Sequence, residues 1–317
     1  PNNSPLLEPI MVYITPAVLE ALPNNYMCVP QLIDILGCLC DKIDNPPTQF
    51  FMLILTFLIN FVFKQETYDD QIIHNYEEYT VVICSLICRH NFFSTENAPE
   101  GVLKIIETCY LSEEHELLTT AFIILTCFFQ AASKASINAE HTFTLISKAI
   151  EIVRTISKGT ENDYDDDDVD VDVDDTDNTI FLSSLLLIST GLIINTPLVI
   201  QMLDEQFLDN WIAQYQIDYY VGEKVEFLQW TTTALLLLSS LDLGQREIRF
   251  FKIAVEQFLY LKNLEAGNAY DKDSLLQYSI SFFPFEDLKC EDHFKQIERT
   301  DPRLGVLDEN TIELFFG

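Results

Sequence analysis

The chain has 317 residues, of which 48% are hydrophobic, and its formal net charge is −32 at pH 7. The apolar share supplies a sizeable core, which excludes disorder over most of the length, and 9 Gly and 12 Pro are too few for the turns of a many-stranded sandwich or barrel. A negative field of this size repels phosphate backbones and anionic lipid, so we expect partners with basic protein surfaces, no direct nucleic-acid binding and no membrane binding.

Apolar residues recur at helical spacing along the first half of the chain. Asn45-Pro46-Pro47 ends the first clear helix, and the next helix is apolar on nearly all sides. Ser112, with Glu116 after it, is the predicted N-terminal signal of a long apolar helix, and Gly159 is the predicted C-cap of the most amphipathic helix. The helices predicted in this half cover residues 29–43, 48–63, 77–90, 98–111, 112–133 and 138–158.

The helical pattern resumes after a strongly acidic run. Pro197 occupies the first-turn position of a short helix that begins at Thr196. Beyond Gly267 the periodicity weakens, and shorter helices are expected there. The helices predicted in this half cover residues 179–195, 196–203, 204–216, 223–241 and 244–265.

Two apolar runs have a composition that a membrane span would also have. They extend from Phe50 to Phe63 and from Ile180 to Ile194. Each is shorter than the roughly 20 residues that a bilayer requires. We therefore expect both to be helices buried inside a soluble protein.

The spacing of the predicted helices indicates the fold. Helices that are apolar all round alternate with amphipathic ones at intervals of roughly 30–40 residues, as in HEAT and armadillo helical hairpins. The predicted fold class is therefore all-α, a HEAT/armadillo-like helical-repeat solenoid, and a compact all-helical bundle is the alternative. N-terminal helical repeats are expected over 1–160, an acidic insertion over 161–178, and C-terminal repeats, continuous with the first set, over 179–317.

Most residues over 161–177 are acids, and no Lys or Arg occurs between 159 and 223. Carboxylates at this density repel one another, so we expect an extended, solvated insertion, with a binding segment for a basic partner as the alternative. Calcium binding is disfavoured, because an EF-hand loop from Asp168 or Asp170 would lack the required Gly and Glu. The Asp-Val-Asp-Val at 170–173 matches the nucleophile motif of haloacid-dehalogenase-type phosphotransferases but lacks the buried strand that the motif follows.

Most of the 8 cysteines lie inside apolar runs, where a free thiol behaves as a small hydrophobic group. Cys84, Cys88 and His90 have a chelate-like spacing, but zinc normally takes four ligands. The remaining ligands would have to come from Cys38 and Cys40, which cannot both point inward from one helix face. We therefore expect these thiols to belong to the core and predict no metal-binding residue. The cysteine spacing and the lack of a signal peptide indicate a reducing compartment.

No catalytic constellation stands out. The sequence contains no Gly-x-Ser-x-Gly, P-loop or Gly-x-Gly-x-x-Gly motif, so we predict that the chain is not an enzyme and has no catalytic residue, cofactor or cofactor-binding residue. The histidines lie among acids without a nucleophile partner, and the two tryptophans are expected to be packing anchors. These residues are His74, His115, His141, His293, Trp211 and Trp230.

The densest basic cluster lies in the stretch "GQREIRFFK". It comprises Arg246, Arg249 and Lys252. We expect a solvated helix face, and an interaction patch on an otherwise acidic surface is the alternative.

The stretch "FLSSLLLISTGLIINTPLVIQML" over 181–203 carries a family resemblance. An apolar helix with small residues, then Gly191 to Asn195, then a short helix at a proline, all just after an acidic run, resembles the armadillo-like helix of the Wapl family of cohesin-release factors. Thr196-Pro197 departs from the apolar-acidic pair that the family pattern leads us to expect. The resemblance implies a HEAT-type domain that binds the ATPase heads and HEAT-repeat subunits of cohesin in the nucleus and promotes cohesin release from chromatin.

These observations together predict a non-catalytic helical-repeat adaptor that binds other proteins. A cohesin-binding regulator of chromosomes in the nucleus is the specific expectation, and its partner-binding residues are not identified by the sequence. The alternative is an acidic scaffold or assembly chaperone that shields a basic client protein in the cytoplasm.

Overall fold

The computed structural model describes residues 48–63, 76–112, 114–160 and 175–210, together with Ala17, Ile35 and single residues between 231 and 254. The elements in this part are helical, and no strand occurs in it, which confirms the all-α prediction there. The chain divides into two compact units. Unit 1 comprises Pro1–Ala139, Val171–Ser183 and Val306–Gly317, and unit 2 comprises Glu140–Asp170 and Ser184–Gly305.

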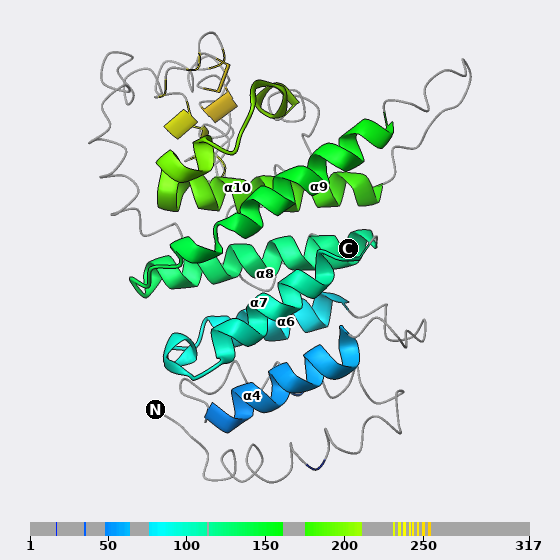
Figure 1. Cartoon of the computed structure of the whole chain (residues 1–317), viewed down its shortest axis with the longest axis vertical. Helices are drawn as coiled ribbons and strands as arrows, with labels where there is room; N and C mark the ends of the chain where they lie inside the picture. The colour runs from blue at the N-terminus through cyan, green and yellow to red at the C-terminus, as the bar shows by residue number, and fades with distance from the viewer. Residues whose placement is uncertain are drawn as a thin grey trace, which may run out of the picture. The chain divides into compact units, whose positions relative to one another are not determined.

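Unit 1 contains the helices predicted over 48–63, 77–90, 98–111 and 112–133. Figure 1 shows α6 and α7 lying between α4 and α8. The helix over 48–63 is continuous but changes to a short π-helical turn, η4, before its end. The elements are α4 (Thr48–Phe57), η4 (Leu58–Val62), α6 (Tyr76–Ile87), η5 (Phe92–Ser94), α7 (Ala98–Cys109) and α8 (His115–Lys134).

Helices α6 and α8 pack side by side and run parallel. The Tyr76 hydroxyl donates to Glu114 Oε2 over 3.5 Å at one end, and the hydroxyl oxygens of Thr80 and Thr120 lie 3.3 Å apart further along. At the other end, the sulfurs of Cys88 and Cys127 are 3.8 Å apart. Residue numbers rise together on both helices, so their directions agree. Because α7 lies between them in the chain, α6 and α8 occupy alternate positions in the helix order.

Helix α4 packs on α7 through a close backbone approach. A Cβ atom at Gly101 of α7 would lie 3.3 Å from Leu55 Cδ1 of α4. Phe51 of α4 also packs against Phe92 of η5, with ring centroids 6.1 Å apart. Glycine at position 101 therefore lets the two helices come together without displacing the Leu55 side chain.

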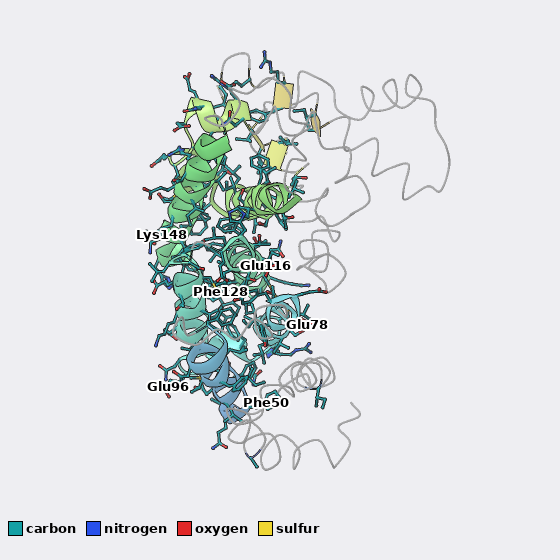
Figure 2. All side chains as sticks on the ribbon, turned by 90° about the vertical axis from the view of Figure 1, so that its right-hand side faces the viewer. Phe50, Glu78, Glu96, Glu116, Phe128 and Lys148 are labelled. Atoms are coloured by element: carbon teal, nitrogen blue, oxygen red, sulfur yellow. The ribbon has the colours of Figure 1, made fainter. Side chains whose placement is uncertain are left out.

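Helix α8 is the most completely buried of the described helices of unit 1. Every residue from Leu117 to Ala132 is buried, since α6 and α7 both pack on this helix. The Phe128 ring packs against the rings of Phe92 and Phe93 of η5, and the centroid distances are 6.4 and 5.3 Å. Figure 2 shows Phe128 among packed side chains, with Glu78 and Glu96 on opposite sides.

Two of the described helices are long and apolar enough to cross a membrane by length and composition alone, His115–Lys134 and Thr179–Ile200. In the first, 89% of the most apolar window is buried inside the protein, and in the second 67%. A core helix of a soluble protein has the same properties, so this is weak evidence for a membrane span.

Local hydrogen bonds define the two ends of α8. Ser112 is not the N-cap that we predicted, because its hydroxyl accepts the Glu114 N–H over 3.1 Å in a local turn, and the helix begins at His115. At the other end, Ile137 N–H donates to Ala132 O over 2.8 Å, and Ser136 N–H donates to Ser133 O over 3.0 Å. Ser136 has φ 57°, so a serine occupies the left-handed position that usually favours glycine.

The next helices are α9 (Thr144–Thr160) and α10 (Asp175–Ile200). The predicted helix over 138–158 starts later, because a separate turn, η6 (Glu140–Thr142), precedes α9, and Gly159 lies inside the helix instead of capping it. Asn195 interrupts α10 with φ −148° and ψ 73°, and its Oδ1 accepts Leu198 N–H over 3.3 Å. The short helix predicted from Thr196 is therefore confirmed, with an asparagine cap before Pro197.

Gly191 of α10 lies in a close contact with α9. A Cβ atom at Gly191 would lie 2.7 Å from Ile146 Cδ1 of α9 and 3.3 Å from Val199 Cγ2. Gly191, Ile146 and Val199 are all buried, so an added methyl group would have no solvent-filled space to occupy. Glycine is required here by packing and not by backbone conformation.

We predict that Ser136→Gly increases the free energy of unfolding by about 0.5–1 kcal/mol, because glycine adopts positive φ without a steric penalty. Thermal unfolding followed by circular dichroism would measure the change. Ser133→Gly is the matched control, since Ser133 is exposed inside the last turn of α8 and its replacement should lower stability by about 0.5 kcal/mol. Destabilisation by Ser136→Gly would contradict the left-handed conformation at this residue.

We predict that Gly191→Ala lowers the free energy of unfolding by about 1 kcal/mol, because overpacking against Ile146 outweighs the gain in helix propensity. Ile146→Val removes the Cδ1 atom that the new methyl group would meet. The double variant should therefore be more stable than the sum of the single effects by about 1 kcal/mol, as measured by urea unfolding. Additive effects would contradict the contact. Gly101→Ala should cost less than Gly191→Ala, because its nearest approach is 3.3 Å and not 2.7 Å.

Candidate functional site

The acidic run was the first candidate site. Residues 161–174, including the Asp-Val-Asp-Val at 170–173, lie outside the described part of the chain. The prediction of an extended segment is wrong for residues 175–177, because α10 begins at Asp175. The long apolar segment that follows favours the helix, because tertiary packing of such a segment supplies most of a helix's stability.

Three cysteines lie where the end of α6 packs on α8. Cys84 and Cys127 are buried and Cys88 is exposed. The Cys127 sulfur lies 3.8 Å from the Cys88 sulfur and 3.8 Å from the Cys84 carbonyl oxygen. We define Cys84, Cys88 and Cys127 as the thiol cluster.

The structure does not combine Cys84, Cys88 and His90 into a metal site. His90 lies exposed in the turn after α6, and among the described residues no group of three or more His, Cys, Asp or Glu is placed to hold a metal ion. Cys38 and Cys40 lie outside the described residues. The sequence pattern missed Cys127 as a neighbour of Cys88, because only the register of α8 against α6 brings it there.

The surroundings of Cys88 and Cys127 favour the protonated form of both thiols. The contact with Cys127, and then burial, raises the pKa of Cys88, and the interaction with Cys84 raises the pKa of Cys127 well above its usual range. The Cys84 carbonyl at the last turn of α6 also turns the negative end of a helix dipole toward Cys127. At neutral pH Cys88 and Cys127 are therefore protonated, so any reaction of their thiolates is slow there.

An ionic cluster lies in unit 2. Asp204 accepts the Phe207 N–H over 2.8 Å, as an N-cap does, and binds Arg154 of α9 over 2.6 Å. Arg246 donates from Nε and Nη2 to the two carboxylate oxygens of Asp209, over 2.8 and 2.9 Å, and lies 3.3 Å from Glu205.

The basic stretch at 246–252 is thus partly engaged within the chain. Hydrogen bonding by Arg246 lowers the pKa of Asp209, so this carboxylate stays charged in contact with its partner. Arg249 is exposed, and Lys252 lies outside the described residues. Arg246 therefore links two segments of unit 2 by ion pairs at the exposed surface.

The other side chains that we considered do not converge. His115 is half-buried at the first position of α8, and His141 is exposed in η6. His74, His293, Trp211 and Trp230 lie outside the described residues.

Comparisons with protein-family models, curated proteins and solved structures found no match to this chain. The case for a function therefore depends on the residues themselves.

We predict that Asp204→Ala lowers the free energy of unfolding of unit 2 by about 1 kcal/mol and speeds hydrogen exchange at the Phe207 amide, because the cap is lost. Asp204→Asn is the matched control, since asparagine keeps the acceptor and loses only the exposed ion pair with Arg154. Its effect should stay within about 0.5 kcal/mol. Equal effects of both variants would contradict the capping role and assign the stabilisation to the ion pair.

Proposed function

We propose that the chain is a non-catalytic adaptor built from α-helical hairpin repeats, which binds other proteins. The observation that supports this most is the parallel packing of α6 on α8, with α7 between them in the chain. In a hairpin stack, each second helix repeats the position and direction of the one two places before it. The α4–α7 contact at Gly101 extends the same pattern to the preceding helices.

The outward face of α7 is polar. In α7, the buried residues Val102, Ile105 and Ile106 alternate with the exposed Glu100, Lys104 and Glu107. Because this surface carries both acidic and basic side chains, it is hydrophilic without being uniformly negative. Most of the 50 acidic residues of the chain lie outside the described helices, and the densest group of them lies over 161–177.

We propose that charge attracts the partner and that the helical surface provides the contacts that select it. A negative field speeds encounter with a basic protein surface and makes the association sensitive to salt. The resemblance of 181–203 to the Wapl family suggests cohesin subunits as the partner and the nucleus as the location. An acidic assembly chaperone for a basic client is the second candidate, and the net charge of −32 favours it.

Affinity purification of the tagged chain from nuclear and cytoplasmic extracts, followed by mass spectrometry, tests the proposal. The cohesin-binding function predicts recovery of the ATPase heads and HEAT-repeat subunits, with recovery falling as salt rises from about 0.1 M to about 0.5 M. Recovery of histones or ribosomal proteins without cohesin would support the chaperone function. Recovery of membrane-trafficking or kinase partners alone would contradict both.

Two charge variants separate the roles of the acidic run and the helices in the same experiment. Asp165→Asn with Asp166→Asn removes two charges from the run, and Glu100→Gln with Glu107→Gln removes two from α7. The first pair should reduce partner recovery more strongly at low salt, because it weakens the denser negative field. Equal losses would contradict a special role for the run.

A further inference from the structure

Two sulfurs of the thiol cluster, those of Cys88 and Cys127, are in contact, and the proposed function makes no use of this contact. Cys88 lies in the turn directly after the last residue of α6, Ile87, and Cys127 lies in the middle of α8. The two sulfurs are 3.8 Å apart, which is van der Waals contact. They come from parallel helices and are separated by 39 positions in the chain.

Of the three thiols, Cys88 and Cys127 are the pair with sulfurs 3.8 Å apart, and Cys88 is the exposed member of that pair. Cys84 and Cys88 are one helical turn apart, and side chains at that spacing have Cβ atoms about 5–6 Å apart, whereas a disulfide needs about 3.5–4.5 Å. Cys84 is only 2% exposed, so an oxidant in solvent does not reach it. Cys88 is exposed, so an oxidant in solvent can reach its sulfur, which already touches the sulfur of Cys127.

We propose that Cys88 and Cys127 form a reversible disulfide when the protein meets a peroxide oxidant. The Cys88 sulfur attacks hydrogen peroxide, so that an S–O bond forms, the O–O bond breaks, and a water molecule leaves. The Cys127 sulfur then displaces the sulfenic oxygen, so that the S–S bond forms and a second water carries away the Cys127 proton. Two thiols and one peroxide give one disulfide and two waters, and a thiol reductant reverses the step.

The crosslink would join the end of α6 to the centre of α8. These are the two helices whose parallel register organises unit 1, so oxidation fixes that register covalently. In a reducing compartment the bond forms only during oxidant exposure. The reaction is slow near neutral pH and speeds up as pH rises, because the attacking species is the thiolate.

Peptide mapping of the full chain tests the pairing. The reduced protein is treated with hydrogen peroxide at pH 7 and pH 8.5, free thiols are blocked with an alkylating agent, and the digest is analysed by mass spectrometry without reduction. We expect a linked peptide pair containing Cys88 and Cys127, more of it at pH 8.5, and its disappearance after reduction. Cys109→Ala, in the buried face of α7, is the control and should leave the linked pair unchanged.

Cys88→Ser provides a second readout that depends little on core packing, because this side chain is exposed. Oxidation should raise the melting temperature of the native protein by roughly 3–6 °C, since the link closes a long loop, and should not change that of Cys88→Ser. A Cys88 that ends as sulfinic acid or bonds to another cysteine, while Cys127 remains a free thiol, would overturn the proposal. An equal melting-temperature shift in Cys88→Ser would overturn it as well.

Discussion

The parallel contact between α6 and α8 is the constraint on which the arrangement of unit 1 depends. It aligns Thr80 with Thr120 and Cys88 with Cys127, so a single register fixes both a polar contact and the thiol pair. Packing of α8 against α6 and α7 supplies much of the free energy that stabilises this contact, since each large apolar side chain contributes roughly 1.5–3 kcal/mol when it is fully buried. The polar pairs add specificity, because a slip along the helix would separate them.

Small residues set the distances between helices in both units. Gly101 allows α4 to approach α7, and Gly191 allows α10 to approach α9 at Ile146. Asn195 then ends the first part of α10 and caps the short helix that follows. In the stretch that carries the family resemblance, packing accounts for Gly191 and helix capping accounts for Asn195.

Hydrophobic periodicity predicted the described helices of unit 1 and the short helix at Thr196, because those segments have clear apolar faces and strong breakers. It misplaced the start of α8, where the Ser112 hydroxyl forms a local turn, and the start of α10, where residues 175–177 join the helix. The thiol cluster and the Arg246–Asp209 pair could not be predicted, since each depends on contacts between helices distant in sequence. Local patterns determine which residues are helical, but they do not determine the register of one helix on another.

The register of α6 on α8 can be tested by nuclear Overhauser effects in protein with labelled methyl groups. The account predicts a contact between the methyl groups of Thr80 and Thr120, whose hydroxyl oxygens are 3.3 Å apart. Contacts of the Thr80 methyl group with another part of α8, and none with Thr120, would show a different register. That result would contradict the parallel contact, the proposed hairpin arrangement and the proposed disulfide.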